Sequence, residues 1–499
     1  MRNKNSLSSV ILLIFFVSGL CSLIYEVIWV RHLTFVFGAT NLAVSSVLAV
    51  FMAGLALGSF YFGRLVDRSS KPLLIYSLLE IGIGIFALFI PFLIPIITSL
   101  YIKVYPFLSH KVLFLNLFRF SLTFLILIVP TLLMGGTLPV IGKFLTTRFQ
   151  TLGRSMGTLY FVNTIGGAIG SLLAGFFLLK IFGVRLTIFF AAFLNIMLGI
   201  LVILLYRRSY SLHFLKRTEK IERRVLKQDE RYSQILLTGV LITFAISGFS
   251  GLAYEVLWTR VLVFIIGNHV YAFTTMLTTF LFGIALGSIL FARLSDSKDN
   301  PAFTLSLLQI GIGISAILLI SIFYHLPYFF QQMIPLVGKS WWKFITLEFI
   351  ICFLIMIIPT TLMGGTFPLV IKIYTPRIQI LGRRVGVAYM LSTLGAIGGS
   401  LVSGFVLIPW IGIQRSIITI AFLNLSMGIL ILYLATSFKN RFVKVLLPSI
   451  ISILIIAIFY LIPSNAKFQP VKPGEELIYY DEGSTGTLLF FGAKMTINF

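Results

Sequence analysis

The chain alternates between long apolar runs and short polar segments, and the lengths of the runs predict membrane-spanning helices. A helix needs about 20 apolar residues to cross the hydrocarbon core of a bilayer. Twelve runs of this kind lie near residues 9–37, 42–63, 73–100, 112–133, 156–180, 186–206, 237–266, 271–292, 302–325, 341–363, 385–409 and 415–434. A thirteenth run covers 444–462. The pattern therefore predicts an all-α polytopic membrane protein with thirteen helices.

The composition agrees with a membrane protein and excludes other classes. Of 499 residues, 58% are hydrophobic and 11% are charged, whereas soluble domains hold roughly a quarter charged residues. The net charge is +24, but 26 of the 39 Lys and Arg residues fall in segments on the N-terminal side of the predicted membrane. We therefore expect a lipid bilayer, and no nucleic acid, as the partner of this basic chain. The two cysteines give neither a disulfide framework nor a metal-ligand spacing.

The distribution of basic residues also predicts the topology. Loops rich in Lys and Arg stay in the cytoplasm, so the N-terminus and the basic linker 207–233 are expected there. The predicted location is the plasma (inner) membrane, with many passes. Thirteen spans then place the C-terminal tail outside, and this parity depends on the span at 444–462.

The strongest signal is an internal repeat with a period of 229 residues. SGLCSLIYEVIWVR at Ser18 returns as SGFSGLAYEVLWTR at Ser247, and PTLLMGGTLPV at Pro130 returns as PTTLMGGTFPL at Pro359. The membrane part is therefore two homologous six-helix units. Because six is an even number, both units have the same orientation. They are parallel repeats, and substrate sites in such folds lie between the halves.

These signals predict five segments along the chain. The two repeats cover 1–206 and 237–436, the basic linker covers 207–236, a thirteenth helix covers 437–463, and a polar tail covers 464–499. In the tail, Ile478–Tyr480 and Thr487–Phe491 read as strands around a turn at Gly483–Gly486. The tail is thus predicted to form a short β-hairpin.

Ionisable side chains inside the predicted spans are the first candidates for a functional site, because each costs roughly 2.5–3.5 kcal/mol at mid-bilayer. They recur in the first helix of each repeat beside an aromatic pair that can stack at i,i+4 spacing. The candidate intramembrane polar site consists of Glu26, Arg31, Tyr25, Trp29, Glu255, Arg260, Tyr254 and Trp258. Each Glu and the Arg five residues on point about 140° apart on the helix, so partners are expected on other helices. A purely structural ion pair between the halves is the alternative.

A second candidate pair comes from opposite charges at equivalent positions. Arg119 and Glu348 lie 229 residues apart, each in the fourth helix of its repeat. Since the repeats are related by a central axis, the two side chains are predicted to form an ion pair between the repeats.

Helix-breaking residues interrupt the fourth helix of each repeat. They are Pro130, Gly135 and Gly136 in the first repeat, and Pro359, Gly364 and Gly365 in the second. Paired interruptions of this kind can mark the binding site of a transporter. The interpretation we favour is a tight turn at the inner end of the helix, because the span before Pro130 is already long enough.

Two family resemblances follow from these motifs. The loop Gly63–Arg68, its copy at Arg293–Asp296 and the two six-helix halves resemble the major facilitator superfamily. The doubled S-G-x-x-x-L-x-Y-E-x-x-W-x-R followed by F-x-x-G-x-A-L-G-S is similar to the membrane region of fused membrane/spermidine synthase-like proteins. The tail segment Tyr479–Thr487 resembles the hairpin before the aminopropyltransferase domain of that second family.

The second resemblance implies an enzyme domain that this chain does not carry. That domain binds decarboxylated S-adenosylmethionine through a glycine-rich loop and uses an acidic residue as general base, and neither follows the hairpin. The chain looks truncated, or its synthase domain is encoded separately, so no catalytic residue, metal or cofactor is expected in it. The expected function is a membrane module that handles polyamine or a related cation. The alternatives are a stand-alone major-facilitator-type solute transporter and a membrane scaffold without its own chemistry.

Overall fold

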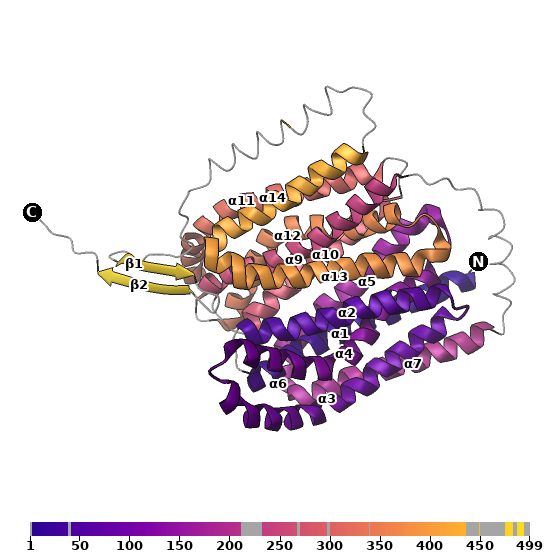
Figure 1. The fold of residues 1–499 in the computed structure, drawn as a ribbon, viewed down its shortest axis with the longest axis horizontal. Helices are drawn as coiled ribbons and strands as arrows, with labels where there is room; N and C mark the ends of the chain where they lie inside the picture. The colour runs from indigo at the N-terminus through magenta and orange to yellow at the C-terminus, as the bar shows by residue number, and fades with distance from the viewer. Residues whose placement is uncertain are drawn as a thin grey trace, which may run out of the picture.

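In the computed structural model, the described residues of the membrane part form twelve long helices, which lie side by side in a bundle (Figure 1). The structure describes residues 2–37, 41–210, 232–266, 270–296, 300–338, 340–435, 449, 475–482 and 487–493. The first repeat contains α1 (Arg2–Phe37), α2 (Asn41–Asp67), α3 (Pro72–Leu108), α4 (Val112–Leu145), α5 (Leu152–Leu173) and α7 (Gly183–Tyr210). The second contains α9 (Gln234–Ile266), α10 (Val270–Leu294), α11 (Pro301–Val337), α12 (Trp341–Tyr374), α13 (Leu381–Val402) and α14 (Ile408–Ala435). The twelve spans predicted for the two repeats are confirmed.

The repeat period of the sequence is also a period of the structure, including its irregular parts. The π-helical turn η2 (Ala174–Leu178) extends α5, and η5 (Ser403–Leu407) extends α13 at the equivalent place. The short helix α6 (Leu179–Ile181) follows η2. Gly183 and Gly412 then turn the chain with φ of +68° and +79°, a conformation that favours glycine. Short 3₁₀ turns, η1 (Phe149–Thr151) and η4 (Ile378–Ile380), precede α5 and α13.

The predicted turn inside the fourth helix of each repeat is wrong. Both α4 and α12 run unbroken through their Pro-Gly-Gly segments for 34 residues. The glycines serve close packing instead, because a Cβ on Gly135 would lie 2.2 Å from the backbone oxygen of Leu55 in α2. After Pro130, the hydroxyl of Thr131 donates to the Leu127 carbonyl of the preceding turn at 2.6 Å. Proline is tolerated inside membrane helices that pack against neighbouring helices.

The two repeats meet along two equivalent seams, where α2 packs on α13 and α5 packs on α10. In the first seam, the Ser59 hydroxyl donates to the Gly386 carbonyl at 3.2 Å. In the second, the hydroxyls of Ser171 and Thr278 lie 2.9 Å apart. Small residues at such contacts let helix backbones approach closely in a membrane. The halves therefore share one interface.

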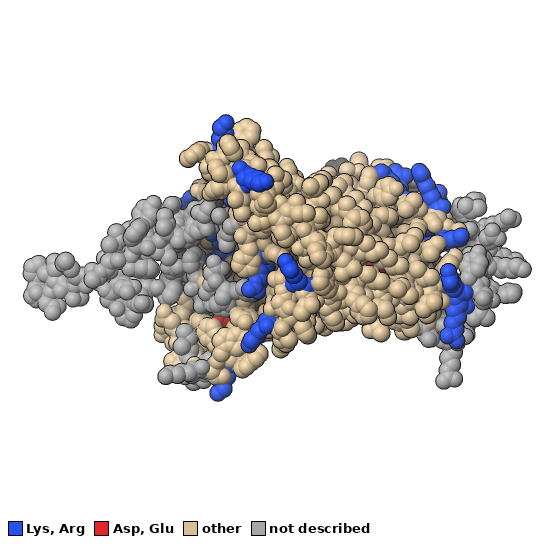
Figure 2. Space-filling view, turned by 90° about the horizontal axis from the view of Figure 1, so that it is seen from below, with Lys and Arg blue, Asp and Glu red and all other residues tan. Residues whose placement is uncertain are grey.

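The outer surface of the bundle fits a bilayer. Eleven stretches of described helix are long and apolar enough to cross a membrane, with α13 and α14 counted as one stretch of 58 residues. Figure 2 shows Lys and Arg toward the two ends of the molecule and a broad band without them between. Large apolar side chains lie exposed on the outside, such as Leu125, 72% exposed, and Phe193, 60% exposed. The chain is thus a multi-pass membrane protein.

Two β-strands lie in the C-terminal tail. The strands β1 (Glu475–Glu482) and β2 (Thr487–Ala493) pair antiparallel from Glu482–Thr487 to Glu475–Ala493. Figure 1 places them at the end of the bundle opposite the N-terminus. The strands of the predicted hairpin are therefore confirmed. The predicted thirteenth helix at 444–462, the turn at 483–486 and residues 211–231 of the linker lie outside the described residues.

Candidate functional site

Two clusters of charged residues join the repeats at the end of the bundle where α1 begins. In the first bridging cluster, the carboxylate of Asp67, at the end of α2, accepts backbone N–H groups from Gly382 (3.0 Å) and Arg383 (2.7 Å) at the start of α13. The Lys143 ammonium of α4 lies 3.0 Å from the same carboxylate. Because the first N–H groups of a helix have no partner within it, an anion at this position is stabilised.

The second bridging cluster repeats the first with the halves exchanged. Asp296, which follows α10, accepts the N–H groups of Gly153 (3.0 Å) and Arg154 (2.7 Å) at the start of α5. The Lys372 ammonium of α12 lies 2.7 Å from the Asp296 carboxylate. Asp296, Lys372, Gly153 and Arg154 each lie 229 positions from their counterparts in the first cluster. The same arrangement of contacts therefore occurs twice.

The two lysines also hold the turns that precede the capped helices. Lys143 donates to the carbonyls of Ile378 at 2.8 Å and of Gln379. Lys372 donates to the Phe149 carbonyl at 2.7 Å. Each lysine thus contacts the aspartate of its own repeat and backbone carbonyls of the other repeat. Together the clusters hold the repeats together at this end.

Sequence reasoning placed these aspartates in a family-like loop but missed their role. The signal was available, since an Asp and a Lys both persist at the 229-residue offset in otherwise variable segments. What could not be read from the sequence is that each Asp would reach the other repeat.

A central polar site lies between the repeats. Glu26 of α1 and Glu255 of α9 are half-buried at equivalent positions of the two repeats. The electrostatic interactions of Glu26 include Glu255, and those of Tyr389 in α13 include Glu26 and Tyr160 of α5. Tyr160 and Tyr389 are themselves 229 residues apart. The site therefore has two carboxylates and two phenols in symmetric pairs, and the two tyrosines were not predicted.

Of the two predicted arginines, Arg31 lies beside an aromatic ring of its own helix. The Arg31 guanidinium lies 5.9 Å from the ring centroid of Phe35, one turn further along α1. Phe35 is 74% exposed on the outside of the bundle. Arg31 thus lies beside an outward-facing side chain, while Arg260 occupies the equivalent position of α9 and is half-buried. The geometry agrees with the angular separation expected for residues five apart on a helix.

The predicted aromatic pairs stack, but they lie inside each repeat. The rings of Tyr25 and Trp29 are 4.9 Å apart and nearly parallel, and those of Tyr254 and Trp258 are 5.1 Å apart. All four side chains are fully buried. The Tyr25 hydroxyl donates to Asn195 of α7 at 3.1 Å, within its own repeat. These aromatic pairs belong to the cores of the halves.

Arg119 makes its polar contacts within the first repeat. Its guanidinium donates to the Tyr101 hydroxyl at 2.8 and 3.0 Å and to the Asn116 side-chain oxygen at 3.2 Å. The prediction placed its partner, Glu348, across the central axis. Asn116 is one helical turn away on α4, and the predicted pairing with Glu348 stays a prediction. Glu348 is fully buried in α12.

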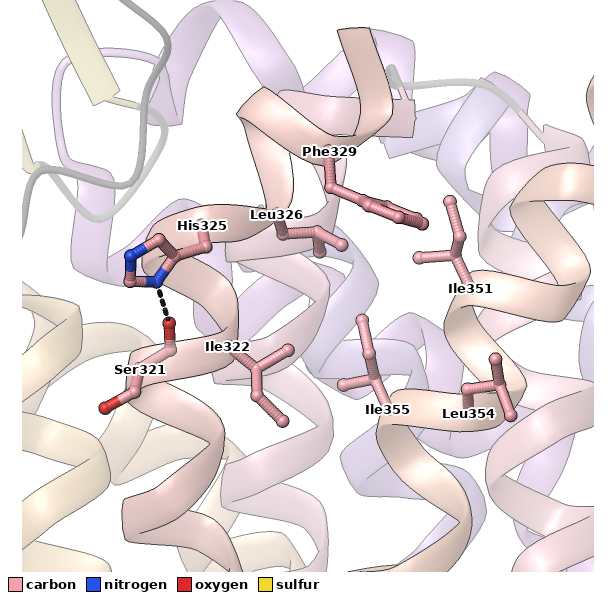
Figure 3. A pocket seen from close by; sticks show the side chains of 8 residues that line it. All are labelled: Ser321, Ile322, His325, Leu326, Phe329, Ile351, Leu354 and Ile355. Atoms are coloured by element: carbon pink, nitrogen blue, oxygen red, sulfur yellow. Dashed lines mark hydrogen bonds between the residues drawn. The ribbon is translucent and has the colours of Figure 1, made fainter. Parts of the chain in front are cut away.

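A groove of about 480 Å³ lies away from the central site, between α11 and α12 (Figure 3). Its walls are almost entirely apolar side chains such as Phe329, Ile351 and Leu354. The polar group at its edge, His325, contacts the Ser321 carbonyl of its own helix at 2.9 Å. Leu354 is 65% exposed, so the groove opens on the outer surface of the bundle.

Comparisons with known proteins agree with this architecture. A profile of the major facilitator superfamily matches residues 11–338. The fold is similar to that of the human organic anion transporter MFSD10 (TETRAN), with a TM-score of 0.54, 12% identity, and coverage of 84% of this chain and 98% of that one. It is also similar to the proton:xylose symporter XylE bound to 6-bromo-6-deoxy-D-glucose, with a TM-score of 0.52, 14% identity, and coverage of 87% and 96%. A sequence comparison with curated proteins gives no match. The chain belongs to the major facilitator superfamily.

Proposed function

We propose that the protein is a solute transporter whose binding site is the central polar site, and that its substrate is an organic cation. The observation that carries the proposal is that Glu26 and Glu255, at equivalent positions of α1 and α9, are half-buried carboxyl groups inside the membrane part. Parallel repeats of this kind bind substrates between their halves near the bilayer midplane. Two carboxylates in a medium of low dielectric attract a cation far more strongly than they would in water.

The chemistry of the site favours a cation with more than one ammonium group. Each carboxylate can accept hydrogen bonds from one ammonium group. Tyr160 and Tyr389 add two aromatic groups at equivalent positions of α5 and α13. A polyamine has ammonium groups linked by short methylene chains, so it matches a site with two acidic and two aromatic groups. Spermidine is therefore the first solute to test.

The bridging clusters support transport by alternating access. They close the repeats at one end of the central site, and their rupture would let the repeats separate there. The last turns of α2, α4, α7, α10 and α12 carry basic residues and end on this same side. By the positive-inside rule we assign this side to the cytoplasm and the protein to the plasma (inner) membrane.

The test is uptake of radiolabelled spermidine into proteoliposomes that contain the purified protein. We expect saturable uptake by the wild type and a loss of at least tenfold in Glu26→Gln and in Glu255→Gln. Glu348→Gln is the matched control, because it makes the same chemical change at a buried position of α12 outside the central site. Uptake of a neutral or anionic solute with no effect of spermidine would contradict the cationic substrate. Equal uptake in all variants would contradict the assignment of Glu26 and Glu255 to the binding site.

A second candidate function is supported by the C-terminal strands alone. Strands β1 and β2 have the sequence that resembles the start of a spermidine synthase-like soluble part. In this case the membrane unit serves a synthase domain that would bind decarboxylated S-adenosylmethionine. We expect no aminopropyl transfer from the purified chain given putrescine and that cofactor, since no glycine-rich cofactor loop is present in its sequence. Clear turnover would contradict this expectation.

A further inference from the structure

A carboxyl group is buried inside the first repeat, away from the central site. Glu80 of α3 has no exposed surface. Its Oε1 accepts a hydrogen bond from the Ser18 hydroxyl of α1 at 2.6 Å. Its Oε2 accepts one from the Asn195 amide of α7 at 2.5 Å. The carboxyl thus joins three helices, and both of these contacts are to neutral groups.

No described Lys, Arg or His forms an ion pair with Glu80. The titratable groups that face it are Cys21 and Tyr25 from α1 and Tyr76 from α3 itself, all neutral or acidic. The group of α7 that contacts Glu80 is the Asn195 amide. Near Glu80, α4 contacts α3 through the apolar side chain of Leu133. A buried carboxylate without a countercharge is costly in a membrane, whereas the protonated acid is not.

The second repeat shows what the same pocket looks like without a carboxyl group. Gln309 stands at the equivalent position, is fully buried, and has no hydrogen-bond partner for its amide among the described residues. There Asn424 donates to Tyr254 at 3.3 Å, whereas in the first repeat Tyr25 donates to Asn195. The amide is reversed because Glu80 takes the Nδ2 group of Asn195.

The ligand that fits this pocket is a proton. A metal cation needs several oxygen ligands, but Asn195 presents an N–H group to Glu80. A hydroxyl can either donate or accept. A proton on Oε1 would therefore reverse the hydrogen bond to Ser18 without moving a heavy atom. The pocket can hold or release a proton at no steric cost.

The network also leads toward the central site. Glu80 contacts Asn195, which contacts Tyr25, and Tyr25 directly precedes Glu26 on α1. Glu80 lies eight residues from the start of α3, about 12 Å along the helix from that end. A change of charge at Glu80 therefore acts on the helix that supplies half of the central site.

We propose that Glu80 is a proton-binding site of the first repeat and that its proton exchange drives solute movement through the central site. The second half of this statement rests on the proposed transport function, whereas the first half does not. The two halves are tested separately.

The proton site is tested by infrared spectroscopy of the purified protein in lipid. A protonated buried carboxyl gives a carbonyl band separate from that of carboxylates. We expect Glu80→Gln to remove such a band, and Glu26→Gln and Glu348→Gln to keep it. Gln309 shows that the fold accommodates an amide at this position, so Glu80→Gln should fold. A spectrum of Glu80→Gln that retains every protonated-carboxyl band of the wild type would overturn the site.

The coupling is tested with spermidine in proteoliposomes under a pH gradient. For one proton per cycle, the steady-state spermidine ratio should change about tenfold per pH unit in the wild type. In Glu80→Gln it should not change, while exchange of internal for external spermidine continues. A tenfold response in Glu80→Gln would overturn the coupling. If the wild type moves no spermidine, the proposed substrate fails, and the infrared result still decides the proton site.

Discussion

Removing the charge of Asp67 should open the end of the protein that the bridging clusters close. In Asp67→Asn the side chain keeps one acceptor for the start of α13 but loses its negative charge. The wild-type carboxylate accepts two backbone N–H groups and contacts the Lys143 ammonium at 3.0 Å. The substitution therefore weakens two contacts between the repeats and the Lys143–Asp67 ion pair within the first repeat.

The size of the effect follows from these contacts. Hydrogen bonds to a charged acceptor are roughly twice as strong as neutral ones, so the two N–H contacts lose about 1 kcal/mol each. The ion pair adds less than about 1 kcal/mol, because its side chains are 11% and 19% exposed and partly screened. Because Asn keeps one hydrogen-bond acceptor, the full sum is not lost. We expect the closed state to lose about 2 kcal/mol, which shifts its equilibrium with the open state about 30-fold.

The assay uses Ser59→Cys as a reporter of opening. Ser59 is fully buried in the seam between α2 and α13, about two turns from Asp67, and the native Cys21 and Cys352 are fully buried as well. We expect N-ethylmaleimide to label the introduced thiol about 30-fold faster in the Asp67→Asn background, in proportion to the population of the open state. Adding Asp296→Asn should raise the rate further, because the second cluster is separate and the energies add.

Arg68→Gln is the control, since Arg68 is exposed beside Asp67 and makes no side-chain contact among the described residues. Equal labelling rates in wild type, Asp67→Asn and the double variant, with all three folded, would refute the assignment of the clusters as the closing contacts. A faster rate in Arg68→Gln would show that the effect is one of general surface charge.

Two further predictions concern stability. Gly135→Ala should lower the free energy of unfolding by about 3 kcal/mol, and with it the thermal midpoint, because its methyl group would meet the backbone of Leu55. Gly251→Ala is the control with open space at the same atom, and equal midpoints in a fluorescence melt would contradict the packing. Tyr25→Phe should cost about 1 kcal/mol through its lost hydrogen bond to Asn195, and an unchanged melt would show that this bond contributes nothing.

The membrane helices could be predicted from the sequence because their signals are local and repeated. Each predicted span of the two repeats corresponds to one described helix, and the 229-residue offset extends even to the π-helical turns η2 and η5. The ends of the spans were placed too early, notably in α4 and α12. Proline and glycine look like breaks to an argument from propensity, whereas in the bundle Gly135 serves to bring α4 close to α2.

The site was only partly predictable, because a single helix does not reveal which neighbour each face meets. Glu26 and Glu255 could be chosen from their cost in lipid alone. Tyr160 could not, since a tyrosine is common in membrane helices and its place at the centre depends on how α5 crosses the seam. Arg119 donates to Tyr101 and Asn116 of its own repeat, and its pairing with Glu348 stays a prediction.

The reciprocal form of the bridging clusters has an evolutionary consequence. Asp67 reaches from the first half to the second, and Asp296 returns the same contact from the second half to the first. A surface that is complementary to its own copy is the hallmark of an isologous dimer. One six-helix ancestor could therefore have assembled and closed as a homodimer before its gene was duplicated and fused. After fusion the two copies became free to diverge, and the carboxyl at position 80 with an amide at the equivalent position 309 is such a divergence.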